Sequence, residues 1–156
     1  MRLARRSAQG FTLIELTVVI GIVAILSAFA ISRINTDSFN TEGFANQAAA
    51  AIRYAQKIAV SQRRNVTVTV SAGSVALSYP DIGTPVRQPP GTDPFTIAKP
   101  SGVTLSGTLV GNTVTFSALG KPTATTLPAT LIVSGGDIAP KTITIVAETG
   151  YVQYVP

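Results

Sequence analysis

The sequence contains no cysteine, no histidine and no tryptophan. Without cysteine it forms no disulfide and offers no thiol nucleophile or thiolate zinc ligand. Without histidine it also lacks imidazole ligands for zinc and every His-based catalytic triad. Its aspartates are scattered, with no Asp-x-Asp run to gather oxygens around calcium, and it has no Gly-rich phosphate loop. We therefore expect no metal, no cofactor and no catalytic residues, and a structural protein rather than an enzyme.

Charged residues are sparse, at 12% of the chain. Twelve Lys and Arg stand against seven Asp and Glu, which gives a formal net charge of +5 at pH 7. Arg2, Arg5 and Arg6 all precede Gly10, so the remainder of the chain is nearly balanced. The basic character belongs partly to this N-terminal segment and is weak evidence for a nucleic-acid partner.

One long apolar run extends from Phe11 to Ser32, and its only charge is Glu15. As a helix it would measure roughly 33 Å, enough to cross a membrane. The basic residues in front of it place the N-terminus in the cytoplasm, so we predict a single transmembrane helix over residues 11–33. No Ala-x-Ala-type site follows a segment of signal-peptide length, which disfavours an ordinary signal peptide. A plain anchor leaves Glu15 unexplained, because a charge there costs about 2.5–3.5 kcal/mol.

A second helical pattern covers residues 34–64. Between Asn35 and Gly43 the residues are poor helix formers, so we expect a loosening or a kink. Beyond Gly43, apolar side chains recur on one helix face: Phe44, Ala48, Ala51, Ile52, Ala55, Ile58 and Ala59. Basic side chains fall near the opposite face, where a solvated surface is a more common role than a ligand site: Arg53, Lys57 and Arg64.

After Arg64 the apolar period changes from 3.6 to 2, which predicts a largely antiparallel β head over residues 65–156. Ala72-Gly73 and Glu148–Gly150 are predicted hairpin turns. The Pro-rich segment from Tyr79 to Phe95 is predicted to be a long surface loop without a strand, because proline cannot donate to a ladder. The predicted strands are Asn65–Ser71, Ser74–Tyr79, Phe95–Lys99, Val103–Ser106, Thr113–Ser117, Thr130–Ser134, Thr142–Ala147 and Tyr151–Val155.

The sequence around Gly10, followed by Phe-Thr-Leu-Ile-Glu-Leu, resembles the class III signal of type IV prepilins and type II secretion pseudopilins. The resemblance implies that a prepilin peptidase cuts between Gly10 and Phe11, removes residues 1–10 as a leader, and methylates the new amine of Phe11. It also implies that the helices bundle in a fibre core, where Glu15 pairs with the Phe11 amine of a neighbouring subunit. A charge pair is tolerable in such an interior, whereas a lone charge is not, so Glu15 would set the register between subunits.

Three segments of the head resemble the GspH/FimT-type branch of minor pseudopilins and minor pilins. They are "AVSQRRNVTVTV", "VTFSALGKPT" and "ITIVAETGYVQ". The implied fold is pilin-like α+β: a long N-terminal helix, half membrane-spanning and half amphipathic, packed on a mostly antiparallel β head of about six to nine short strands. Many major pilins carry a proline at the position of Ser32 and close a C-terminal loop with a disulfide. This chain has neither, which favours a minor subunit.

The resemblance implies a structural and initiating subunit of a type IV pilus or a type II secretion pseudopilus. Before assembly it would sit in the inner membrane as a single-pass protein, with its head outside the cytoplasm. Its partners would be other pilins or pseudopilins at a fibre tip, the prepilin peptidase and the inner-membrane platform.

The alternative is a minor pilin that binds DNA for uptake. FimT-like relatives of that kind use a Gly-Arg-x-Arg element, but the matching segment here, Gly150–Gln153, lacks both arginines. Because phosphate contacts need such cations, the sequence does not favour nucleic acid as a partner. The remaining candidates for an anion patch are Arg53, Lys57, Arg63 and Arg64.

Overall fold

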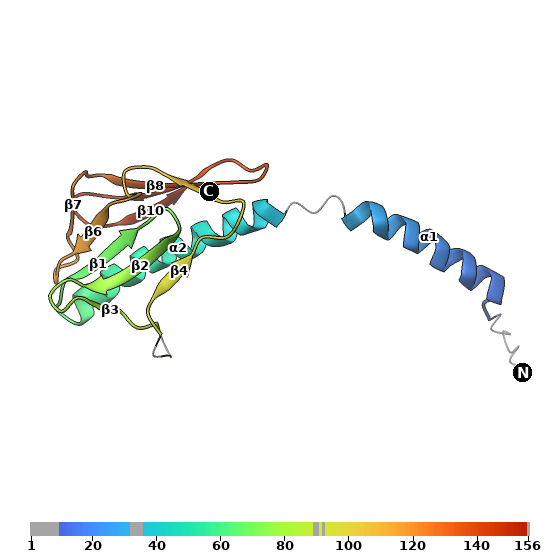
Figure 1. Ribbon diagram of the computed structural model, residues 1–156, viewed down its shortest axis with the longest axis horizontal. Helices are drawn as coiled ribbons and strands as arrows, with labels where there is room; N and C mark the ends of the chain where they lie inside the picture. The colour runs from blue at the N-terminus through green and yellow to red at the C-terminus, as the bar shows by residue number, and fades with distance from the viewer. Residues whose placement is uncertain (1–9, 32–35, 89–90, 92, 156) are drawn as a thin grey trace, which may run out of the picture. The chain divides into compact units, whose positions relative to one another are not determined.

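The computed structural model describes residues 10–31, 36–88, 91 and 93–155 and divides into two compact units, residues 1–34 and 35–156. The first unit contains helix α1 (Leu13–Ile31). The second contains helix α2 (Thr36–Ser61) and all the strands, and we call it the head (Figure 1). The predicted leader, apart from Gly10, and residues 32–35 lie outside the described residues.

Helix α2 buries the apolar face that its period predicts. All seven predicted positions, from Phe44 to Ala59, are buried, and Thr41, Ala45 and Ala49 join them. Most of these side chains are alanines, so the helix axis can lie close to the strands beneath it. The predicted amphipathic helix is therefore confirmed over Thr36–Ser61.

The loosening expected between Asn35 and Gly43 is wrong for residues 36–43, where α2 is continuous. Packing of α2 against the strands overrides the weak local propensity of this stretch. The buried Thr41 hydroxyl donates to the Asp37 carbonyl at 2.7 Å. The turn after strand β8 (Ala129–Ser134) approaches the helix so closely that a Cβ at Gly136, whose φ is +64°, would meet the backbone of Ser38. Only glycine allows that approach.

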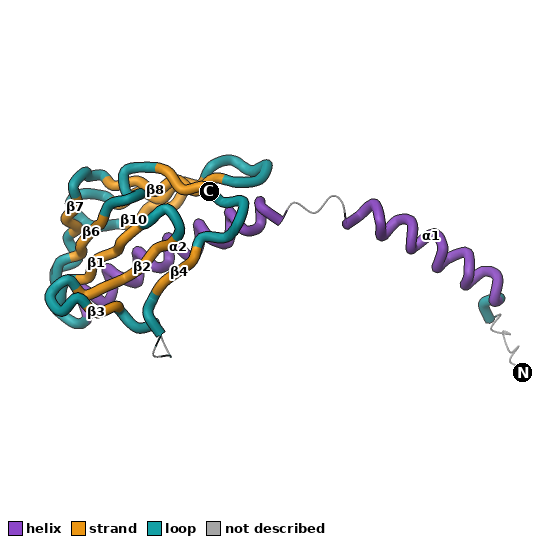
Figure 2. Tube along the Cα trace, viewed as in Figure 1, coloured by secondary structure: helices purple, strands orange, loops and turns teal. Residues whose placement is uncertain are grey.

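The strands form two sheets on which α2 lies, as Figure 2 shows. The larger sheet has the order β3-β2-β1-β6-β7, with β4 also paired to β2, and the smaller has the order β10-β9-β8-β5. Every pairing between named strands is antiparallel. The strands are β1 (Val66–Val70), β2 (Ser74–Tyr79), β3 (Thr84–Pro85), β4 (Thr96–Ala98), β5 (Thr104–Ser106), β6 (Thr113–Phe116), β7 (Pro122–Ala124), β8 (Ala129–Ser134), β9 (Lys141–Ile145) and β10 (Val152–Val155).

The eight predicted strands are all present, and both predicted hairpins are confirmed by their registers. Val70 pairs with Val75 across Ala72-Gly73, and Val152 pairs with Ile145 across the turn at Glu148–Gly150. Strands β3 and β7 were not predicted from the sequence. Both contain proline and lie at edges of the larger sheet. Proline is tolerated there because the outer side of an edge strand needs no ladder bond.

The Pro-rich segment is more ordered than the sequence predicted, and its prediction as a loop without a strand is wrong around Thr84–Val86. Strand β3 pairs with the end of β2, and the next residue, Val86, is 1% exposed. The Val86 amide donates to the Leu77 carbonyl at 2.9 Å, and the Phe95 amide donates to the Val86 carbonyl at 2.7 Å. Burial of Val86 therefore attaches the segment to the head.

The core lies between α2 and the inner faces of both sheets. Alternate residues of β1, Val66, Val68 and Val70, are fully buried, as the period-2 pattern predicts. The smaller sheet contributes the next set, with Leu131 and Val133 on β8 and Ile143 and Ile145 on β9. One helix thus closes a single core over two sheets.

A chain that begins at Thr36 should fold without α1, because every buried apolar residue in the described part of the chain lies at Phe44 or beyond. Circular dichroism should show a mainly β spectrum with a minority of helix, and thermal unfolding should be cooperative. The matched control is the same chain with Val68→Asp, which places an unpaired charge in the core and should unfold it. A helix-dominated or unfolded spectrum for the unsubstituted chain would contradict the architecture.

Candidate assembly surfaces

Helix α1 presents apolar side chains on all sides. The large apolar residues from Phe11 to Phe29 are between 47% and 84% exposed, and no buried face exists over residues 13–29. A helix that is apolar all round needs an apolar environment, in a membrane or among other helices. Within the described residues, no helix reaches the length and hydropathy needed to cross a membrane. The predicted span of residues 11–33 stays a prediction.

The predicted processing residues lie immediately before this helix. Gly10 and Phe11 precede the first helical residue, Leu13, and the Phe11 side chain is 81% exposed. Nothing lies within 4 Å of a Cβ built on Gly10. The Thr12 hydroxyl accepts a hydrogen bond from the Glu15 amide at 3.3 Å, which caps the first turn of α1. Gly10, Phe11 and Thr12 are thus exposed residues outside the helix, as a peptidase substrate requires.

Glu15 lies in the first turn of α1, between Ile14 and Leu16. Both of these neighbours are exposed apolar side chains. The Glu15 carboxylate makes no ion pair or hydrogen bond with the described residues of its own chain. A single copy of the protein therefore offers this charge no partner within that part of the chain.

Gln56 on α2 joins two turns that are distant in sequence. Its side-chain amide donates to the Gly120 carbonyl at 3.0 Å and to the Thr149 carbonyl at 2.9 Å. A Cβ at Gly150, whose φ is +68°, would meet the Gly120 carbonyl oxygen and the Gln56 amide nitrogen. Two of the head segments that carried the family resemblance therefore meet at one side chain of the helix. No sequence signal pointed to Gln56.

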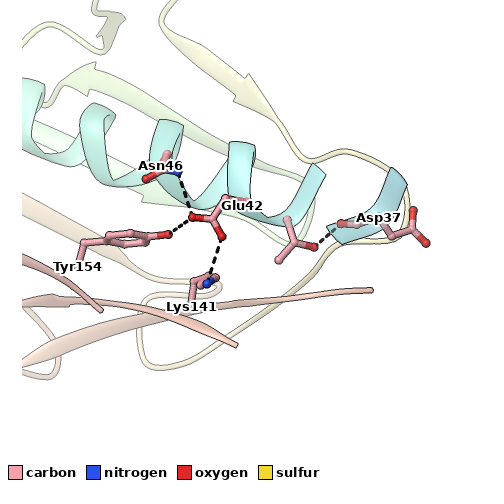
Figure 3. A network of polar contacts seen from close by, with 6 residues as sticks. Asp37, Glu42, Asn46, Lys141 and Tyr154 are labelled. Atoms are coloured by element: carbon pink, nitrogen blue, oxygen red, sulfur yellow. Dashed lines mark hydrogen bonds and ion pairs between the residues drawn. The ribbon is translucent and has the colours of Figure 1, made fainter. Parts of the chain in front are cut away.

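Glu42 is the centre of a polar network between α2 and the smaller sheet (Figure 3). The Lys141 ammonium lies 3.1 Å from Glu42 Oε2, and the Tyr154 hydroxyl donates to Glu42 Oε1 at 3.3 Å. The Asn46 side-chain amide donates to the same oxygen at 3.5 Å. The Lys141 side chain is only 13% exposed, so its charge depends on Glu42 for a partner. The network ties the start of α2 to β9 and β10.

The network shifts two pKa values in opposite directions. The hydrogen bond from Lys141 lowers the pKa of Glu42 from its usual 4.5, with Tyr154 and Asn46 acting the same way. Burial raises the pKa of Tyr154 above 10.0, and the negative charge of Glu42 adds to that effect. The folded head therefore favours ionised Glu42 and neutral Tyr154.

The four predicted anion-patch residues do not form one free cluster. Arg64 pairs with Asp81 at 2.7 Å, and its guanidinium lies over the Tyr79 ring at 4.3 Å. The hydrogen bond between Arg64 and Asp81 raises the pKa of Arg64 and lowers that of Asp81. Arg53 donates to the Val152 carbonyl at 3.2 Å. Lys57 and Arg63 are exposed. Nothing in the described residues favours the DNA-binding alternative, and the patch stays a prediction.

The described residues hold no group of three or more His, Cys, Asp or Glu side chains placed to bind a metal ion. The ion pairs of the head are instead isolated contacts between elements. Lys121 and Glu148, for example, lie 3.3 Å apart beside the turns that Gln56 joins, and both side chains are largely exposed. Such a pair stabilises a fold only slightly.

We expect Glu42→Gln to make the head less stable at neutral pH but not in acid. The pKa of Glu42 is lowered by folding, so its stabilising effect is present above pH 4.5 and is lost as the pH falls through the folded-state pKa. Urea unfolding of wild type and variant should be compared at a series of pH values between about 3 and 7. The difference between the two curves should shrink steadily toward the acid end.

The matched control is Asp93→Asn, at an exposed carboxylate that makes no ion pair with the described residues. It should reproduce no such pH-dependent difference. A stability difference for Glu42→Gln that is constant from neutral to acid pH would mean that the Lys141 contact does not depend on the charge of Glu42.

Comparison with known proteins gives two sequence matches. Residues 45–150 match the family described as "Type II transport protein GspH", and residues 5–31 match the "Prokaryotic N-terminal methylation motif". The first match begins within α2 and ends at the turn before β10. A search of curated proteins finds no match.

Two solved proteins share the fold. The type IV minor pilin FimU of Pseudomonas aeruginosa is 18% identical, with a TM-score of 0.53 over 74% of this chain and 87% of that one. The minor pseudopilin EpsH from the Type 2 Secretion System of Vibrio cholerae is 13% identical, with a TM-score of 0.59 over 74% of this chain and 96% of that one. At these identities the likeness concerns the fold alone.

Proposed function

Because the chain belongs to the GspH family of type II transport proteins and carries the N-terminal methylation motif, we propose that it is a minor pilin or pseudopilin. The observation that carries this function is the division of the chain. Residues 5–31 match the methylation motif and include a helix that is apolar on all sides, whereas residues 45–150 match GspH and form a packed head. The helix would polymerise, and the head would make specific contacts.

Processing begins at Gly10 and Phe11. A prepilin peptidase cuts between these residues and methylates the amine of Phe11, and the exposed residues before α1 support this step. Before cleavage the protein is anchored in the inner membrane through residues 11–33 with its head on the outer side. Cleavage creates a cationic amine at Phe11, four residues before Glu15 in the chain.

Assembly then uses Glu15. The carboxylate has no partner in the described part of its own chain, and it stands among exposed apolar side chains. In a bundle of α1 helices these apolar surfaces would bury one another, and an unpaired charge would be strongly penalised. Pairing Glu15 with the Phe11 amine of a neighbour removes that penalty at one axial offset only. The pair therefore selects the register of the fibre.

The head makes the contacts with other subunits that give this protein its role as a minor, initiating subunit near the fibre tip. Its partners are other pilins or pseudopilins, together with the inner-membrane platform that extracts subunits. The support for this role is the GspH match over the head, since α1 alone would serve any subunit of such a fibre. We propose no catalytic activity for the head.

We expect Glu15→Leu to be inserted and cleaved normally but to enter fibres poorly. Insertion should become easier by about 2.5–3.5 kcal/mol, because a charge leaves the bilayer. Incorporation should fall, because the Phe11 amine of a neighbour loses its partner in a dry interior. Each variant is co-expressed with companion subunits, the cells are sheared, and the protein in the sheared fraction is quantified against total mature protein.

Two further variants separate charge and processing. Glu15→Gln keeps shape and hydrogen bonding without charge, and it should lose incorporation as well. Gly10→Val should block cleavage, because the peptidase fits the backbone closely at this position, and it should leave a longer precursor in the membrane. Wild-type incorporation of cleaved Glu15→Leu would refute the pairing role, and normal cleavage of Gly10→Val would refute the processing site.

A further inference from the structure

Tyr54 stands between two cavities on the side of the head where α2 meets the segment before β4. The cavities measure about 450 and 470 Å³, and Tyr54 contributes to the wall of both, so they adjoin along the helix. The first is closed by the segment from Thr84 to Arg87, and the second by Gln88, Phe95 and Ile97. We call the two together the Tyr54 groove.

The second cavity forms an apolar floor of the Tyr54 groove. The rings of Tyr54 and Phe95 stack with centroids 5.3 Å apart and planes 25° apart. Ala50, Ala51 and Ile97 complete the second cavity, with Gln47 and Gln88 as its polar residues. Side chains this small on α2 leave room beside the helix, and stacked rings present a surface suited to apolar side chains.

Arg87 is the only charged residue among the described residues that line the groove. It is exposed, and its guanidinium makes no ion pair or side-chain hydrogen bond with any residue that the structure describes. Arg64, by contrast, forms an ion pair with Asp81 and lies over the Tyr79 ring. A guanidinium without a partner among the described residues, beside an apolar floor whose described lining holds no acidic residue, is complementary to a carboxylate.

The groove is also bordered by an open strand edge. Strand β4 pairs with β2 on one side and with no other described strand. The Leu77 amide donates to the Phe95 carbonyl at 3.1 Å, and the Lys99 amide donates to the Gly73 carbonyl at 2.9 Å. Because these directions alternate along a strand, the backbone groups of Thr96 and Ala98 point away from β2. They are available to pair with an added strand.

We propose that the Tyr54 groove docks an extended, carboxylate-bearing segment of a companion subunit of the fibre. The segment adds a short strand to the open edge of β4 and lays an apolar side chain on Tyr54, Phe95 and Ile97. Its carboxylate pairs with Arg87. Main-chain pairing supplies affinity, whereas the apolar floor and the single cation specify which segment fits. This inference rests on the proposed function, since it names the chemistry of the partner contact.

The test uses the full chain co-expressed with its companion subunits. Arg87→Glu should reduce incorporation into the sheared fibre fraction about tenfold relative to total mature protein, because attraction to the carboxylate becomes repulsion. Arg87→Gln should lie between this variant and wild type. The matched control is Lys121→Gln, which also removes one exposed positive charge but lies outside the groove, and it should behave as wild type. Equal amounts of mature protein in the membrane exclude a folding defect.

A photo-crosslinking residue at Gln88 then identifies the occupant in assembled fibres. The expected product joins this chain to a companion subunit at a peptide that contains Asp or Glu beside the linked residue. Wild-type incorporation of Arg87→Glu would overturn the docking proposal, and so would a link to a second copy of this chain or to a peptide without a carboxylate. Absence of the unsubstituted chain from fibres would instead overturn the proposed function, and the docking proposal with it.

Discussion

The alanine face of α2 packs against both sheets of the head, and this contact holds the two sheets together. Ala45, Ala48, Ala55 and Ala59 are fully buried, so the helix backbone lies close to the strands. A larger side chain at any of these positions would push the helix away from one sheet and open the core between them. Because two sheets share this one helix, neither has a core of its own without it.

Polar side chains on α2, and Arg64 just beyond its end, then contact more distant parts of the chain. Glu42 holds Lys141 and Tyr154, Gln56 holds the turns at Gly120 and Thr149, and Arg64 holds Asp81. These contacts are individually modest, but they reach both sheets and the Pro-rich segment. Arg87 beside Tyr54 makes no such contact with the part of the chain that the structure describes, which is why the docking proposal assigns it to a partner.

Local patterns in the sequence were enough to predict the features that depend on the spacing of nearby residues, such as a buried helix face or a hairpin. The buried face from Phe44 to Ala59 and the hairpin at Ala72-Gly73 follow from spacing alone. The contacts of Arg53 and Gln56 join residues 99 and 93 positions apart, and no periodicity carries that information. The kink expected before Gly43 failed because long-range packing stabilises a stretch whose own propensity is poor. No pattern in the sequence distinguishes Arg87 from the other arginines, because whether a cation has a partner depends on the fold around it.

The proposed assembly requires that the N-terminal segment be processed so that Phe11 and Glu15 can pair between subunits in a fibre. Mass spectrometry of this chain in sheared, purified fibres tests it most directly. We expect an N-terminal peptide that begins at Phe11 and carries one methyl group on its amine. A fibre-bound chain that still begins at Met1 would contradict this processing. Fibres that contain the companion subunits but never this chain would contradict its role as a fibre subunit.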